Sequence, residues 1–145
     1  MQHSRSVGGV VIGPNGKIAL ASQHDTSWSF PKGRPKGNED DAATFKRELQ
    51  EETGLTQSQF IKHLGTYQRT QLREDGTEDR STIKTLSMGL YTTTQTSLHP
   101  TDPDNPEARW VSPQQVAKLL THPKDKAFYE SVKDQVLEVI TGLKP

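Results

Sequence analysis

The sequence of 145 residues contains no cysteine, which excludes a disulfide framework, a thiolate metal site and a cysteine nucleophile. It has no surplus of charge either, because 18 basic side chains balance 18 acidic ones. That balance argues against non-specific binding to nucleic acid or membranes. No apolar run approaches the roughly 20 residues of a membrane helix, and the first six residues lack the apolar segment of a secretory signal. We therefore expect a cytoplasmic protein, monomeric or homodimeric, with no membrane partner and with nucleic acid disfavoured as a partner.

Apolar residues make up only 30% of the chain, so a compact core under a polar surface is expected. The length fits a single domain over residues 1–145. Composition and periodicity predict strands at 6–12, 17–22, 28–30, 60–72, 81–94 and 108–111. Helices are predicted at 40–53, 112–120 (opened by Ser112-Pro113) and 125–142. This order of elements indicates a layered α/β (mixed α+β) domain.

The segment 33–55 is the most informative part of the chain. Its first half is punctuated by glycine and proline and reads as a loop, and its second half has the period of a helix. Asn38 is a possible N-cap, and Gly54 stands where a left-handed C-terminal cap favours glycine. The segment is therefore expected to form a loop followed by a capped helix.

Three acids of this helix, Glu48, Glu51 and Glu52, recur three and four residues apart and so share one helical face. Their mutual repulsion is relieved only in part by Arg47. Carboxylate oxygens are preferred ligands of hard divalent cations, so the cluster predicts a site for Mg²⁺ or Mn²⁺. The alternative is a solvated amphipathic helix whose glutamates only face water.

Basic side chains precede the helix at Lys32, Arg34 and Lys36. Cations beside a carboxylate helix suit a polyphosphate bridged by a metal ion, whereas a plain solvated loop would only balance the acids. Tyr67 and Tyr91 lie in strands rich in threonine and glutamine, and either could stack on a base or pack within the sheet. Trp110 is expected to be buried.

The segment also resembles the Nudix box of the Nudix hydrolases at every fixed position, which reads Gly33, five residues, Glu39, seven residues, Arg47-Glu48-Leu49, one residue, Glu51-Glu52, one residue, Gly54-Leu55. A helix that is merely solvated would not require the two glycines or the loop glutamate, so these positions favour the resemblance. The resemblance implies a mixed sheet sandwiched between helices. It also implies hydrolysis of a nucleoside diphosphate linked to another group, with Mg²⁺ or Mn²⁺ as cofactor and a nucleotide as the small-molecule partner.

By the same resemblance, Glu51 and Glu52 are the main metal ligands, joined by Glu48 and by the backbone carbonyl of Lys32. Arg47 would orient a glutamate, and Glu39 would support the loop. Three residues remain candidates for activating water in the family pattern, namely Glu48, Glu52 and Glu107. Glu107 reads equally well as a solvent-facing loop acid.

For the substrate, Trp28-x-Phe30-Pro31-Lys32-Gly33 resembles the branch that cleaves dinucleoside polyphosphates such as diadenosine tetraphosphate. Lys84 then matches a polyphosphate-binding lysine and Tyr67 a base-stacking tyrosine. Diphosphoinositol polyphosphates, RNA 5′ ends and oxidised nucleoside triphosphates remain alternatives.

Two other classes of protein fit the sequence less well. A non-catalytic nucleotide-binding regulator with this fold is disfavoured by the complete glutamate set. A calcium-stabilised structural domain is disfavoured because no acidic loop has calcium-binding spacing, and the segment 101–105 is read as a plain loop.

Overall fold

The structure is a computed structural model that describes residues 1–24 and 26–143. Its elements in chain order are β1 (Gln2–Ile12), β2 (Ile18–Gln23), β3 (Ser27–Ser29), β4 (Lys32–Gly33), α1 (Asp41–Thr53), β5 (Gln59–Leu72), β6 (Glu78–Thr92), β7 (Ala108–Val111), α2 (Val116–Leu119) and α3 (Pro123–Leu143).

The strands form one mixed sheet in the order β3-β2-β1-β6-β5, with β4 paired to β1 and β7 paired to β2. β1 runs parallel to β6 over its whole length, whereas β5 and β6 form a long antiparallel hairpin. Asp75-Gly76 supplies the turn of that hairpin, as the Asp-Gly pair favours, with Gly76 at a φ of 88°.

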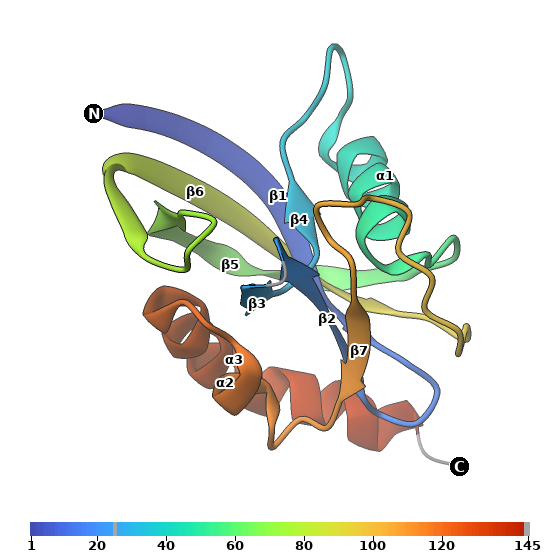
Figure 1. Cartoon of the computed structure of the whole chain (residues 1–145). Coiled ribbons are helices and arrows are strands. Elements are labelled where there is room, and N and C mark those ends of the chain that lie inside the picture. Colours follow the sequence, from blue (N-terminus) through green and yellow to red (C-terminus); the bar gives the residue numbers. More distant parts are fainter. Residues whose placement is uncertain (25, 144–145) are drawn as a thin grey trace.

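Helices cover both faces of the sheet, with α1 on one face and α2 and α3 on the other (Figure 1). The side chains of β1 alternate between the two faces. Val10 and Ile12 belong to a large core under α2 and α3, and Val7 and Val11 belong to a small core under α1. The predicted α/β class, with a mixed sheet between helices, is therefore confirmed.

The helix predicted at 40–53 agrees with α1 within one residue, but its predicted cap is wrong, and so is the predicted start of the next helix. Asp40, not Asn38, caps α1, because the Asp40 carboxylate accepts a hydrogen bond of 2.8 Å from the Ala43 N–H. The helix predicted from Ser112-Pro113 begins only at Val116. Residues 113–115 form a turn instead, and the Pro113 carbonyl accepts a hydrogen bond from the Tyr129 hydroxyl of α3.

Two smaller expectations also need correction. Lys32, expected in the loop before the helix, instead lies in β4, where it pairs with Gly8 of β1 and its side chain is buried. Trp110 is half-buried, and its indole N–H donates to the Thr96 carbonyl. In the part of the chain that is described, none of the helices has the length and apolar character required to cross a membrane.

Candidate active site

The helix α1 presents the predicted acids beside β4. Its N-terminus is capped by Asp40, and its C-terminus ends at Gly54, whose φ of 81° is left-handed. Leu49 and Phe45 anchor the helix in the small core. Glu48 and Glu52 each follow one of these two residues by three positions, so they lie at the edge of the apolar stripe, where the helix packs against the β4 segment. Local sequence therefore fixes which face of α1 carries the glutamates.

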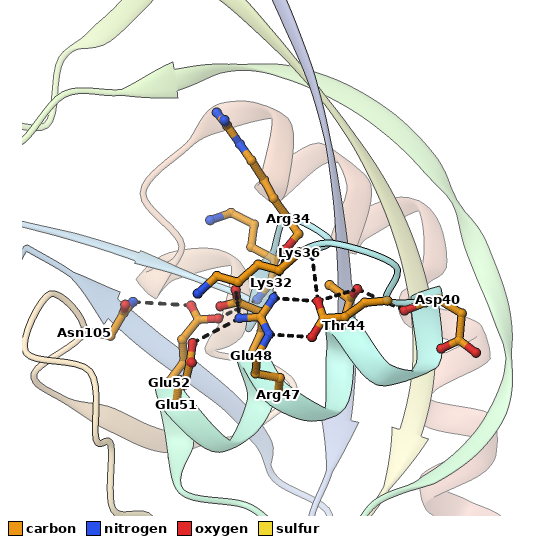
Figure 2. A network of polar contacts seen from close by, with 11 residues as sticks. Lys32, Arg34, Lys36, Asp40, Thr44, Arg47, Glu48, Glu51, Glu52 and Asn105 are labelled. Carbon is orange, nitrogen blue, oxygen red and sulfur yellow. Dashed lines mark hydrogen bonds and ion pairs between the residues drawn. The ribbon is translucent and has the colours of Figure 1, made fainter.

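Arg47 is the centre of the polar network on this face (Figure 2). Its guanidinium binds Glu39 through two hydrogen bonds, Nε to Oε2 at 2.8 Å and Nη2 to Oε1 at 3.0 Å. Its Nη1 donates to Glu48 Oε1 at 2.8 Å and to Glu51 Oε2 at 3.3 Å. The hydrogen bond from Arg47 is the main reason that the pKa of Glu39 falls to about 2. Arg47 thus holds three carboxylates together.

Glu39 in turn fixes the loop before the helix. Its Oε1 accepts hydrogen bonds from the Lys36 N–H at 2.8 Å and the Thr44 hydroxyl at 3.2 Å. Arg47 Nη2 also donates to the Arg34 carbonyl at 2.9 Å. The expected supporting role of Glu39 accords with these contacts.

Glu52 is the most buried acid of the cluster, with 3% of the residue exposed. Its Oε2 accepts a hydrogen bond of 3.0 Å from the Lys32 N–H, and its Oε1 accepts one of 3.3 Å from the Asn105 amide. Burial raises the pKa of Glu52 to about 8, although the nearby Lys32 works in the opposite direction. The Lys32 peptide therefore lies directly against this carboxylate.

Gly33 explains why the motif begins with glycine. A Cβ atom at this position would stand 2.0 Å from Cδ of Glu48. The bare backbone lets the Glu48 carboxyl group pack directly on β4. Glu48, Glu52 and the Lys32–Gly33 backbone therefore meet at one place, where every offered ligand atom is an oxygen.

A closed metal site is not formed by the side chains as they stand. Within residues 1–24 and 26–143, no three histidine or acidic side chains are arranged to hold a metal ion. The Nη1 atom of Arg47 lies between Glu48 and Glu51 and supplies the positive charge there. The donor set, three carboxylates and a peptide carbonyl, nevertheless has the chemistry of a Mg²⁺ or Mn²⁺ site.

The predicted substrate-binding cations are split between two environments. Arg34 and Lys36 are exposed on the loop between β4 and α1. Lys32 and Lys84 are buried on the face of the sheet that α3 covers. The neighbouring Lys32 ammonium, together with burial, lowers the pKa of Lys84 to about 6, and burial likewise lowers the pKa of Lys32.

Tyr67 and Glu107 both have partners within the protein. The ring of Tyr67 stacks on Phe128 at 4.5 Å between centroids, and its hydroxyl donates to Asp125 at 2.5 Å. The Glu107 carboxylate binds Arg109 at 2.6 Å. Tyr91 stacks on Phe45 in the small core. Roles for Tyr67 in base stacking and for Glu107 in activating water therefore stay predictions.

Sequence reasoning missed two residues of this region. Asn105, in the segment read as a plain loop, bonds Glu52 and also donates to the Ser22 carbonyl at 2.8 Å. A single loop amide gives no pattern to detect. Arg69 had a signal, because it follows Tyr67 by two residues in a strand and so shares its face. Arg69 Nη1 donates to Asp125 at 2.8 Å.

Comparison with known proteins identifies relatives by sequence. The chain is 36% identical over 64 residues to an RNA pyrophosphohydrolase of Caulobacter vibrioides, a match that covers 41% of this chain and 37% of that protein. It is 43% identical over 56 residues to the mRNA-decapping protein g5R of African swine fever virus, over 34% of this chain and 23% of that protein. The matches thus span well under two thirds of either relative.

Solved structures share the whole fold at low sequence identity. The NUDIX domain of Shewanella oneidensis NrtR, complexed with ADP ribose, has a TM-score of 0.73 at 13% identity and covers 94% of this chain and 90% of its own. A Caenorhabditis elegans Ap4A hydrolase has a TM-score of 0.72 at 18% identity, over 94% and 98%. At such identities the likeness shows the fold alone.

The family itself is shown by a match over nearly the entire chain. Residues 2–132 match the NUDIX domain, and this range contains α1, its glutamates and the strands that carry Lys32 and Lys84. The chain belongs to the Nudix hydrolase family.

Proposed function

We propose that this protein is a divalent-cation-dependent pyrophosphohydrolase that cleaves a phosphoanhydride in nucleoside polyphosphates. The first candidate substrate is a dinucleoside polyphosphate such as diadenosine tetraphosphate. One observation carries the proposal, namely that Glu48 and Glu52 of α1 pack against the Lys32–Gly33 backbone while Arg47 holds Glu51 beside Glu48. Acids gathered in this way suit a cation that binds pyrophosphate oxygens.

Mg²⁺ or Mn²⁺ is the proposed cofactor. Glu48 Oε1 and Glu51 Oε2 both lie within 3.3 Å of one nitrogen of Arg47, so the two carboxylates already converge on a single positive charge. Glu52 and the Lys32 carbonyl would complete the ligand set. When bound, the cation supplies charge neutralisation at the phosphoryl oxygens and lowers the pKa of water.

The remaining roles fall to side chains of this chain. Arg34 and Lys36 approach the polyphosphate from the loop, and Lys32 and Lys84 from the sheet, where their charges offset those of the phosphoryl oxygens. Arg47 orients Glu48 and Glu51 and is itself held by Glu39. Glu48, Glu52 and Glu107 are the candidates to accept the proton of the attacking water.

RNA 5′ ends are the second candidate substrate. Two relatives by sequence are named an RNA pyrophosphohydrolase and an mRNA-decapping protein, and both chemistries break a phosphoanhydride at an RNA end. The zero net charge argues against RNA as the substrate, because RNA affinity usually depends on a basic surface that neutralises phosphates.

Replacing Glu52 by glutamine tests the proposal. Glu52→Gln keeps the size of the side chain and its place beside Lys32, but removes the charge that a cation and a proton would use. Turnover should fall by roughly 10²–10⁴-fold while the far-ultraviolet circular dichroism stays unchanged. The measurement is product release with Mg²⁺ or Mn²⁺ from dinucleoside polyphosphates, triphosphates, diphosphoinositol polyphosphates and 5′-triphosphorylated RNA in heavy-oxygen water. Product masses identify the phosphorus attacked.

Glu74→Gln, at the exposed tip of the β5–β6 hairpin, is the matched control and should retain full turnover. Full activity in Glu52→Gln would refute the site. If the parent protein binds nucleotides but hydrolyses none of them with either cation, the alternative of a non-catalytic nucleotide-binding regulator is favoured instead.

A further inference from the structure

Three cations lie buried together on the α3 side of the sheet. They are Lys32 of β4, Arg69 of β5 and Lys84 of β6, with 7%, 3% and 8% of each residue exposed, and we call them the buried cation cluster. Arg69 and Lys84 stand directly opposite each other in the β5–β6 register. Lys32 is close enough to be the largest influence on the pKa of Lys84.

The cluster has few acidic partners within the protein. Asp125 forms an ion pair with Arg69, with 2.8 Å between Nη1 and Oδ2. Among the residues that the structure describes, the ammonium groups of Lys32 and Lys84 form no hydrogen bond or ion pair, and the buried Nε of Arg69 has no partner. Glu52 is the other acid that influences both lysines, but its oxygens accept from the Lys32 N–H and Asn105. A fully buried guanidinium N–H without an acceptor, as at Arg69 Nε, is unfavourable unless an anion joins it.

Asp125 and Tyr67 hold Arg69 in place. The two oxygens of Asp125 are divided between the Tyr67 hydroxyl and Arg69 Nη1, and the Tyr67 ring is stacked on Phe128 of α3. Asp125 is 1% exposed, so this arrangement is shielded from water. Such contacts fix the plane of a guanidinium and leave its other N–H groups to bind an anion.

We propose that the buried cation cluster is an anion site that binds a phosphoryl group of the substrate, and that Arg69 is one of its ligands. Asp125 and Tyr67 are positioning residues in this site. The inference rests on the proposed function. It adds Arg69 as a phosphoryl ligand and places the phosphoryl group on the α3 side of the sheet. Lys32 joins the two parts, because its N–H faces Glu52 of the α1 site while its side chain enters the cluster. A polyphosphate could therefore reach both.

The competing explanation is a purely structural ion pair that ties α3 to β5. It accounts for Asp125 and the Nη1 atom of Arg69, but it leaves the fully buried Nε of Arg69 without an acceptor. A structural pair and an anion site respond differently to substitution, because only the anion site loses affinity for a phosphate compound when a cation is removed.

Binding of inorganic tripolyphosphate without divalent cations provides the direct test, by titration calorimetry. Lys84→Met removes one ammonium group, and the double variant Arg69→Met/Asp125→Asn removes the guanidinium without stranding a buried carboxylate. Arg73→Met removes an arginine of the same hairpin that is more than half exposed, and serves as the control. We expect each cluster variant to lose about tenfold or more in affinity and the control to change less than about twofold.

The outcomes separate this inference from the proposed function. Cluster variants that fold by circular dichroism and bind tripolyphosphate like the parent would overturn it, as would a parent protein that does not bind tripolyphosphate. A weakened tripolyphosphate affinity with an unchanged KM for the nucleotide would show that the anion is not the substrate. If tripolyphosphate binds as expected and no nucleotide is hydrolysed, the anion site stands and the pyrophosphohydrolase proposal fails.

Discussion

Lys84 is a residue whose charge is expected to oppose folding. Its ammonium lies in a site that already contains Lys32 and Arg69, and these charges together with burial lower its pKa to about 6. A group of this kind destabilises the folded chain wherever it must be charged. Removing it should therefore stabilise the protein and weaken phosphate binding together, as at many binding sites.

The pH dependence of that stabilisation can be stated in advance. Below pH 6 Lys84 is protonated in both folded and unfolded chains, so the folded state carries the full penalty. Between pH 6 and its ordinary pKa of 10.5, the folded chain holds fewer protons, so its stability relative to the unfolded chain rises with pH. Lys84→Met should thus have its largest advantage at pH 5 and a smaller one at pH 9.

Urea unfolding of the parent and Lys84→Met at both pH values, without divalent cations, measures this difference. Lys17→Met on the short β1–β2 turn is a suitable control, because the Lys17 side chain is exposed. A Lys84→Met protein less stable than its parent at pH 5 would show that the ammonium group is paired in solution and that the penalty is absent.

At the scale of elements, α1 is set by its two ends. The left-handed cap at Gly54 is confirmed, and its N–H donates to the Gln50 carbonyl at 2.8 Å. The N-terminal cap was predicted two residues early. Asn38 and Asp40 are both good caps by type, so composition alone could not choose between them. The contacts of Glu39 with Arg47 and the Lys36 N–H keep residues 36–39 in a loop conformation, so the helix begins after Asp40.

Substitution at the two positions tests this assignment. Asp40→Ala removes the hydrogen bond to the Ala43 N–H and a negative charge at the positive end of α1, and should lower the free energy of unfolding by about 1 kcal/mol. Asn38→Ala should have almost no effect, since Asn38 is exposed and does not cap the helix. Chemical denaturation curves of both variants give the comparison, and equal losses would contradict the cap at Asp40.

Local patterns predicted most of the elements, including the glutamate-bearing helix α1, because those depend on residues near in sequence. The strand 108–111 and the hairpin turn at Asp75-Gly76 follow from alternation and turn chemistry. The predictions that failed concern residues whose environment is set by tertiary contacts. The Pro113 carbonyl accepts a hydrogen bond from Tyr129 of α3 and not from a residue of its own predicted helix. Asn105 binds Glu52, which is distant in sequence. Arg69 and Lys84 meet only through the β5–β6 register, which sequence did not specify.

At the scale of the whole molecule, one sheet separates two apolar cores. Val136 of α3 lies in the large core and Leu49 of α1 in the small core, and neither residue is more than 1% exposed. Because β1 sends alternate side chains into both cores, loss of either core exposes the other face of the same strand. The two cores should therefore unfold together in a single transition.

The two tryptophans allow this to be measured, since Trp28 packs against the large core and Trp110 against the small one. Leu49→Ala should lower the free energy of unfolding by about 2–5 kcal/mol and Val136→Ala by roughly 2 kcal/mol. In each variant, fluorescence of proteins that retain only Trp28 or only Trp110 should report the same urea midpoint. Separate midpoints, with the lower one following the substituted core, would show that the α1 face opens on its own. The helix α1 would then be a unit less stable than the sheet that carries Lys32 and Lys84.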